Sequence, residues 1–266
     1  MPIRLIALDL DGTVLTSDRS PHPLMASALA RATDRGIVLC FASGRTVASI
    51  RVFARELGVS VPMVGCNGAY SVRADGRELH HEPVPDFVRD RVLDYADEAG
   101  IHVNLYSRDE VLYPEASPWN DLYLSRVKNL EPRQVSRETM RQTSVTKLLL
   151  IDDPERIQRH LTYLRTQVSP DEGAVTISEP EYLEFLPPRV NKGFAVAKVA
   201  EDLGIAQAEV AAMGDYLNDL EMLEWAGVSA APANAAAPIL RLVDRSFSSN
   251  NEGGAAEFVD WIVSNE

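Results

Sequence analysis

Stretches that mix polar and apolar residues alternate with short apolar runs along much of the chain. Five of the mixed stretches end in a glycine, and an isoleucine or valine follows each of these glycines. Glycine suits the left-handed position just past a helix, and β-branched residues suit the strand that comes next. This repeated order of helix, glycine and strand predicts an α/β protein with a mostly parallel sheet. The five glycines are Gly36, Gly58, Gly100, Gly204 and Gly227.

Four of the apolar runs lack the alternation of a strand that has one face in water. Helices on both faces of a parallel sheet produce such runs, because each strand is then buried on both sides. We therefore expect a Rossmann-like core whose strands include residues 5–10, 37–43, 62–66 and 209–214.

The middle of the chain, from about residue 82 to residue 188, has a different pattern. Prolines are denser there, aromatic residues collect, and short apolar strands come in adjacent pairs. Adjacent short strands favour an antiparallel sheet, which helices over 85–99 and 154–167 would cover. The predicted strand pairs are 101–106 with 110–114, and 174–178 with 182–187.

Proline-rich joints at 82–86 and 186–193 bound this middle region. Such joints carry few long-range contacts and are typical of domain boundaries. The sequence therefore predicts a core made of residues 1–82 and 188–266, with an α+β domain of residues 83–187 inserted between its two pieces.

The composition is that of an ordinary globular protein, with 266 residues, 45% hydrophobic and 24% charged. The net charge of -13 argues against nucleic acid or an anionic membrane surface as a partner. No apolar run approaches the length of a membrane span, and we expect no signal peptide. With only Cys40 and Cys66, a disulfide framework is not expected, so the cytoplasm is the expected location.

Candidate chemistry begins where the first predicted strand ends in two carboxylates, Asp9 and Asp11. Residues two apart on a strand share a face, so both side chains can reach one site. An Asp-Gly turn would explain Gly12 and Asp11, but it gives no reason for Asp9 inside an apolar run. Two carboxylates this close repel each other, so we expect something to hold them together.

Small polar groups follow the next two predicted strands. Ser43 or Thr46 could cap the following helix, but a hydroxyl beside a glycine, here Ser43 beside Gly44, also suits a phosphate group. Arg45 comes next. Asn67 lies beside Gly68 and is most simply part of a turn, with a substrate contact as the second interpretation.

Two further segments come after the second proline-rich joint. Lys192 falls in the first turn of a predicted helix, where a lysine is mildly unfavourable. Asp215, Asn218 and Asp219 follow the strand predicted over 209–214. Asp and Asn are common near helix starts. This preference explains Asn218 and Asp219 without a functional role, but it explains Asp215 less well.

Open α/β sheets bind ligands at the carboxyl ends of their strands, so these groups are expected to meet. Clustered carboxylates without histidine or cysteine favour a hard cation, and Mg²⁺ is the expected one. A lysine, a hydroxyl and Mg²⁺ suit the oxygens of a phosphoryl group. One aspartate could attack the phosphorus while the other moves a proton.

The order of these segments resembles the four motifs of the haloacid dehalogenase (HAD) superfamily. The segments are DLDGT at 9–13, SGR at 43–45, Lys192, and GDYLND at 214–219. The large insert before Lys192, with NGA at 67–69 ahead of it, is similar to the Cof-type branch of capped sugar-phosphate phosphatases. The resemblance implies a HAD-like core with an inserted α+β cap domain.

The resemblance also implies a role for each motif residue. Asp9 would be the nucleophile, and Asp11 would serve as general acid and then as general base. Mg²⁺ would be held by Asp9, by Asp215 and by the backbone carbonyl of Asp11. The phosphoryl group and the rest of the substrate would be contacted by Ser43, Gly44, Arg45, Asn67, Lys192 and Asn218. Asp219 would orient Lys192 or a water on the metal.

The activity implied is hydrolysis of a small phosphorylated metabolite, a sugar phosphate above all, through an aspartyl-phosphate, with the cap selecting the leaving group. Two other functions stay open: a sugar phosphomutase, and a binding protein without turnover. The second aspartate argues against a binding protein, which has no need for it. Tyr216 replaces a residue that is often small in the family, and nothing in the sequence requires a dimer.

Overall fold

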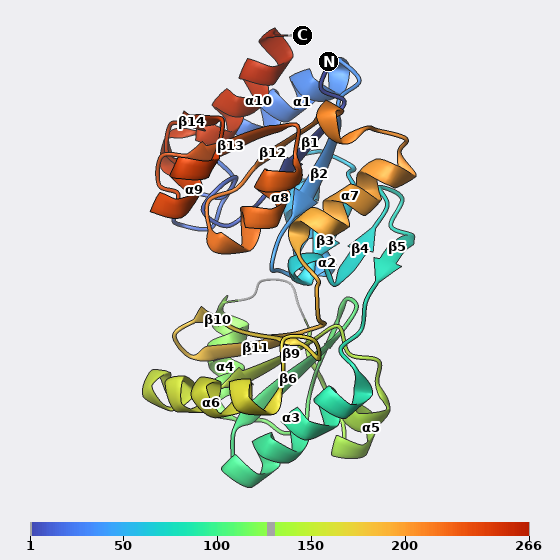
Figure 1. Cartoon of the computed structure of the whole chain (residues 1–266), viewed down its shortest axis with the longest axis vertical. Helices are drawn as coiled ribbons and strands as arrows, with labels where there is room; N and C mark the ends of the chain where they lie inside the picture. The colour runs from blue at the N-terminus through green and yellow to red at the C-terminus, as the bar shows by residue number, and fades with distance from the viewer. Residues whose placement is uncertain (1, 127–130, 266) are drawn as a thin grey trace. The chain divides into compact units, whose positions relative to one another are not determined.

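The computed structural model describes residues 2–126 and 131–265. The chain divides into two compact units (Figure 1). The core unit consists of Met1–His80 and Asn191–Glu266, and the inserted unit consists of His81–Val190.

The core unit is built around an eight-stranded sheet in the order β14-β13-β12-β1-β2-β3-β4-β5. The strands from β14 to β3 are parallel to their neighbours, whereas β4 is antiparallel to β3. The predicted α/β fold with a parallel-sheet core is therefore confirmed. The strands are Leu5–Leu8 (β1), Val38–Ala42 (β2), Met63–Gly65 (β3), Tyr70–Val72 (β4), Glu78–His81 (β5), Val210–Met213 (β12), Val228–Pro232 (β13) and Arg245–Phe247 (β14).

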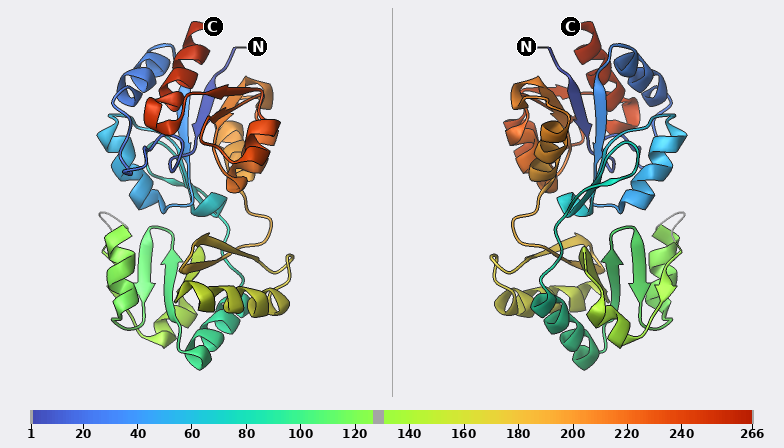
Figure 2. Two further views of the ribbon diagram at one scale, coloured as in Figure 1. Left: turned by 90° about the vertical axis from the view of Figure 1, so that its left-hand side faces the viewer. Right: turned by 90° about the vertical axis from the view of Figure 1, so that its right-hand side faces the viewer.

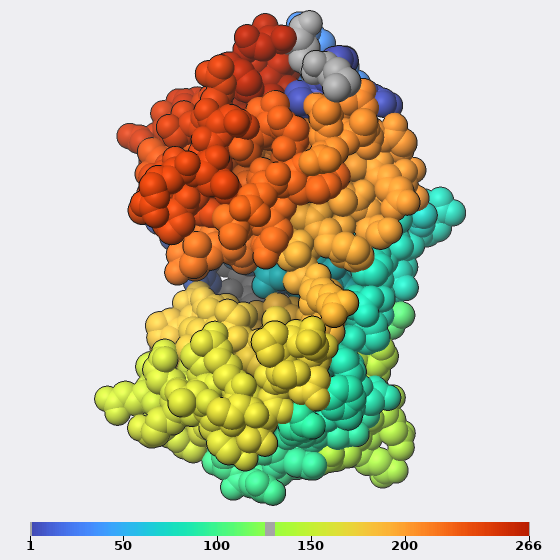
Figure 3. All heavy atoms as spheres, viewed as in Figure 1, coloured from blue at the N-terminus to red at the C-terminus, as the bar shows by residue number. Residues whose placement is uncertain are grey.

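Helices cover both faces of this sheet (Figure 2). Within β1, Ile6 and Leu8 pack in one hydrophobic cluster with α1, α2 and α10, whereas Leu5 and Ala7 pack in another with α7, α8 and α9. Burial on both sides explains the continuous apolar runs. Helices α7 and α8 lie side by side on the surface shown in Figure 3. The helices are Met25–Asp34 (α1), Val47–Glu56 (α2), Lys192–Asp202 (α7), Leu220–Trp225 (α8), Ala237–Leu242 (α9) and Gly254–Ser264 (α10).

The inserted unit has a six-stranded sheet in the order β10-β11-β9-β6-β7-β8. All neighbouring strands are antiparallel except β7 and β8, which are parallel. Both predicted strand pairs are present, as β6 with β7 and as β10 with β11. The strands are His102–Ser107 (β6), Glu110–Tyr113 (β7), Arg133–Gln134 (β8), Lys147–Ile151 (β9), Ala174–Glu179 (β10) and Tyr182–Leu186 (β11).

Three helices of the inserted unit, α3 (Asp86–Ala99), α5 (Arg137–Gln142) and α6 (Pro154–Gln167), supply side chains to the larger hydrophobic cluster of this unit. Helix α4 (Pro118–Arg126) contributes Tyr123 to a second, smaller cluster. The two helices predicted for this region correspond to α3 and α6. Over residues 2–126 and 131–265, every helix is too short or too polar to span a membrane.

Candidate active site

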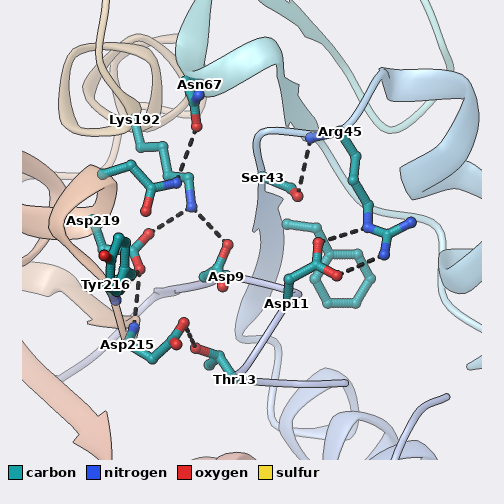
Figure 4. A network of polar contacts seen from close by, with 12 residues as sticks. Asp9, Asp11, Thr13, Ser43, Arg45, Asn67, Lys192, Asp215, Tyr216 and Asp219 are labelled. Atoms are coloured by element: carbon teal, nitrogen blue, oxygen red, sulfur yellow. Dashed lines mark hydrogen bonds and ion pairs between the residues drawn. The ribbon is translucent and has the colours of Figure 1, made fainter. Parts of the chain in front are cut away.

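Polar side chains from three neighbouring strands meet at one edge of the core sheet (Figure 4). Asp9 directly follows β1, Ser43 directly follows β2, and Asp215 comes two residues after β12. The Asp9 amide donates to the Met213 carbonyl at 3.0 Å, which continues the pairing of β1 with β12. Parallel pairing thus brings together residues from opposite ends of the sequence.

Lys192 places a buried ammonium group between two carboxylates. Its side chain is 1% exposed, and Nζ lies 2.6 Å from Asp9 Oδ1 and 2.6 Å from Asp219 Oδ1. Burial by itself lowers the pKa of Lys192, but Asp219 and Asp9 outweigh burial and raise this pKa overall. Lys192 therefore keeps its positive charge at neutral pH.

Asp219 fixes both the lysine and the loop that carries Asp215. Its Oδ1 accepts from Lys192, while its Oδ2 accepts from the amides of Asp215 at 2.9 Å and Tyr216 at 3.1 Å. Asp219 therefore contacts both Lys192 and the backbone of the loop after β12. Residue Tyr216 itself is 60% exposed.

The carboxylates of Asp9, Asp215 and Asp219 form an acidic cluster, with one oxygen of each within 4.8 Å of the others. Burial raises the pKa of Asp9 well above its usual range, against the influence of Lys192, and the neighbouring carboxylates raise it further. Burial and Asp219 raise the pKa of Asp215 to about 6. Ionising these carboxyl groups is therefore costly unless a cation lies nearby. All the donor atoms of the cluster are oxygens, which are the ligands that Mg²⁺ prefers.

The loop after β1 holds the Asp215 carboxylate in place. Thr13 Oγ1 donates to Asp215 Oδ1 at 3.2 Å. A Cβ added at Gly12, where φ is +80°, would lie 2.3 Å from Asp215 Oδ2, so only glycine leaves room for this carboxylate. We did not predict the contact from Thr13, although Thr13 closes the DLDGT segment.

Asp11 points toward Arg45 rather than joining the acidic cluster (Figure 4). Arg45 Nε lies 2.6 Å from Asp11 Oδ2, and Arg45 Nη2 lies 2.6 Å from Asp11 Oδ1. The Asp11 side chain is 48% exposed, whereas Asp9 is buried. Arg45, which we expected to contact the substrate, thus contacts the predicted general acid and base.

The remaining predicted residues lie on neighbouring loops at the same sheet edge. Ser43 is buried, and its Oγ accepts from the Arg45 amide at 3.2 Å. Asn218 Nδ2 donates to Asn67 Oδ1 at 3.1 Å, which links the loop after β3 to the loop after β12. A Cβ added at Gly44 would lie 3.2 Å from Asn67 Oδ1, so the loop after β2 also lies close to the loop after β3.

Comparison with known proteins identifies the family of this chain. A model of the haloacid dehalogenase-like hydrolases matches residues 6–259. The chain belongs to this family. The resemblance inferred from the four ordered motifs is therefore confirmed, and this haloacid dehalogenase-like hydrolase is an enzyme, as predicted.

Similar proteins of the same family are phosphatases. This hydrolase is 30% identical to the HMP-PP phosphatase of Cronobacter sakazakii, over 89% of this chain and 86% of the relative. It is 27% identical to the 5-amino-6-(5-phospho-D-ribitylamino)uracil phosphatase YitU of Bacillus subtilis, over 96% of each chain. The solved structure of TM0651 from Thermotoga maritima covers 97% of each chain with a TM-score of 0.89 and 26% identity.

Proposed function

We propose that this hydrolase is a Mg²⁺-dependent phosphatase that cleaves a small phosphorylated metabolite through an aspartyl-phosphate on Asp9. The proposal rests on the buried Lys192 ammonium 2.6 Å from Asp9 Oδ1. A fixed positive charge at this point favours the ionised nucleophile and also offsets the charge of a phosphoryl group that approaches it.

In the first step, an Asp9 oxygen attacks phosphorus, and the bond between phosphorus and the leaving-group oxygen breaks. Asp11 gives a proton to that oxygen, which leaves as an alcohol. Lys192 and Ser43 donate hydrogen bonds to the phosphoryl oxygens, because an ammonium and a hydroxyl match their negative charge.

In the second step, water attacks the phosphorus of the aspartyl-phosphate, and Asp11 accepts a proton from this water. The bond between phosphorus and the Asp9 oxygen breaks. The products are inorganic phosphate and the restored Asp9 carboxylate, so each residue returns to its starting state.

Mg²⁺ would be held by Asp9 and Asp215, with the backbone carbonyl of Asp11 as a third ligand. When bound, it supplies positive charge that offsets the charge of the carboxylates and of the phosphoryl group. Asp219 is a positioning residue in this scheme, because its two oxygens already accept from Lys192 and from backbone amides.

We propose a sugar phosphate as the substrate class. The similarity to YitU supports this choice, since the name of that enzyme specifies a 5-phospho-D-ribityl group. A phosphate ester of a primary alcohol on a polyhydroxy chain also needs a proton on its leaving oxygen, which Asp11 would supply.

The direct test is phosphate release from ribose 5-phosphate, glucose 6-phosphate, pyridoxal 5′-phosphate and p-nitrophenyl phosphate, with Mg²⁺ and with EDTA. We expect release that EDTA abolishes, with a sugar phosphate giving the highest kcat/KM. Absence of release from the folded protein with Mg²⁺ would refute phosphatase activity. Phosphate transfer that requires a sugar bisphosphate would instead identify a mutase, and saturable binding without turnover would identify a binding protein.

A further inference from the structure

Arg45 and Asp11 form a two-point ion pair at the edge of the core sheet. The distances from Arg45 Nε to Asp11 Oδ2 and from Arg45 Nη2 to Asp11 Oδ1 are both 2.6 Å. The side chains are 16% and 48% exposed, so water screens the pair and its contribution to stability is small. Its two parallel hydrogen bonds nevertheless fix the plane and the direction of the Asp11 carboxylate.

The guanidinium is itself anchored by its own segment of the chain. Arg45 Nη1 donates to Ser49 Oγ at 3.4 Å, and Arg45 Cζ lies 5.1 Å from the centre of the Phe53 ring. Ser49 and Phe53 are four residues apart on α2, so they present one helix face to Arg45. The Arg45 amide donates to Ser43 Oγ at 3.2 Å, which fixes the backbone as well.

From these contacts we infer that Arg45 is a positioning residue for Asp11 and is not a ligand of the phosphoryl group. The inference rests on the proposed function, in which Asp11 gives and takes protons. Each carboxyl oxygen has two lone pairs, and the Arg45 fork uses one on each oxygen. The second lone pair on one of these oxygens carries the proton that goes to the leaving group and later accepts the proton of the attacking water, in a plane that Arg45 sets.

Phenyl phosphate and p-nitrophenyl phosphate test this inference, because the oxygens of their leaving groups differ in how much they need a proton. p-Nitrophenolate leaves readily without one, whereas phenolate is more basic and depends more on a general acid. We expect Arg45→Lys and Arg45→Ala to lower kcat/KM for phenyl phosphate about tenfold more than kcat/KM for p-nitrophenyl phosphate. Both esters are measured on one protein sample, so a loss of folded enzyme cannot change the ratio.

Two further variants make the test specific. Asp11→Asn should shift the ratio in the same direction, and Arg45→Ala added to Asp11→Asn should shift it no further, because Arg45 acts through Asp11. Arg55→Ala removes an exposed arginine from the last turn of the same helix and should leave the ratio at its wild-type value.

Three results would count against this inference. A higher KM for both esters with unchanged kcat would make Arg45 a substrate-binding residue. An equal loss of kcat/KM for both esters would show that Arg45 does not act through protonation of the leaving group. If the wild-type protein with Mg²⁺ hydrolysed neither ester, the proposed function itself would fail, and the inference would fail with it.

Discussion

Lys192 Nζ lies 2.6 Å from Asp9 Oδ1, although the two residues are 183 positions apart in the sequence. The start of α7 sets the lysine in place, since Asn191 Oδ1 accepts from the Phe194 amide at 2.7 Å and so caps the helix. A buried ion pair contributes little net stability compared with well-packed apolar residues. Its presence at a sheet edge is therefore best explained by function.

Asp9→Asn should reduce phosphate release at least about a thousandfold, because an amide cannot serve as the attacking nucleophile. The measurement is kcat with p-nitrophenyl phosphate and Mg²⁺. The matched control is Asp34→Asn, which changes an exposed aspartate at the end of α1 and should leave kcat unchanged. Retention of a substantial fraction of kcat in Asp9→Asn would mean that Asp9 is not the nucleophile.

Lys192→Met should lower the free energy of unfolding by about 3–5 kcal/mol, because Asp9 and Asp219 would remain buried without their cation. Urea denaturation at pH 7 without Mg²⁺ measures the change. Adding Asp219→Asn to this variant removes one uncompensated charge and should restore part of the loss. A Lys192→Met protein as stable as the wild type would contradict this account of the buried pair.

Gly12→Ala should raise the Mg²⁺ concentration needed for half-maximal activity about tenfold or more, because the new Cβ would displace the Asp215 carboxylate. Gly36→Ala is the matched control. Gly36 has a φ of +77° against +80° at Gly12, but a Cβ at Gly36 meets nothing within 4 Å among residues 2–126 and 131–265. Equal effects of the two substitutions on Mg²⁺ would show that backbone strain, and not the clash with Asp215, is responsible.

Stabilisation by Mg²⁺ should increase from pH 5 to pH 7. The pKa of Asp215 in the folded protein is about 6, above its ordinary value of 3.8, so the folded state binds this proton more tightly than the unfolded state. This tighter binding adds up to about 3 kcal/mol to the free energy of unfolding. The gain is fully present below pH 3.8 and is lost as pH rises through about 6. Mg²⁺ binds the ionised form and offsets this loss.

The measurement is the Tm with and without Mg²⁺ at both pH values. Asp215→Asn should raise the Tm of the metal-free protein at pH 7 and remove most of the Mg²⁺ effect. A Tm shift on Mg²⁺ addition that is the same at pH 5 and pH 7 would argue against Asp215 as the titrating ligand.

Local patterns in the sequence were sufficient for much of the fold. Four of the five glycines that follow polar stretches have the positive φ expected just past a helix. Gly227 does not, and it is required for a different reason: a Cβ there would lie 2.7 Å from the Ala208 Cα. Both predicted strand pairs of the inserted unit follow from short-range pattern as well, because their partners are adjacent in the chain.

Strand β9 was not predicted, although it lies between β11 and β6 in the inserted sheet. Its sequence, Lys147–Ile151, contains three consecutive leucines, which suit a helix or a strand equally well in so short a run. Backbone hydrogen bonds to β11 and β6 make this segment a strand. Neither of these partners is adjacent to β9 in the sequence.

The sequence by itself determined which residues carry polar chemistry at the strand ends, because the strand, the following glycine and the motif are all encoded within a few residues. Only the tertiary structure decided how those residues pair. Arg45 meets Asp11, and Asp219 meets both Lys192 and the Asp215 amide. Such pairings depend on which loops the parallel sheet brings together, and their distances and directions are a property of the packed core.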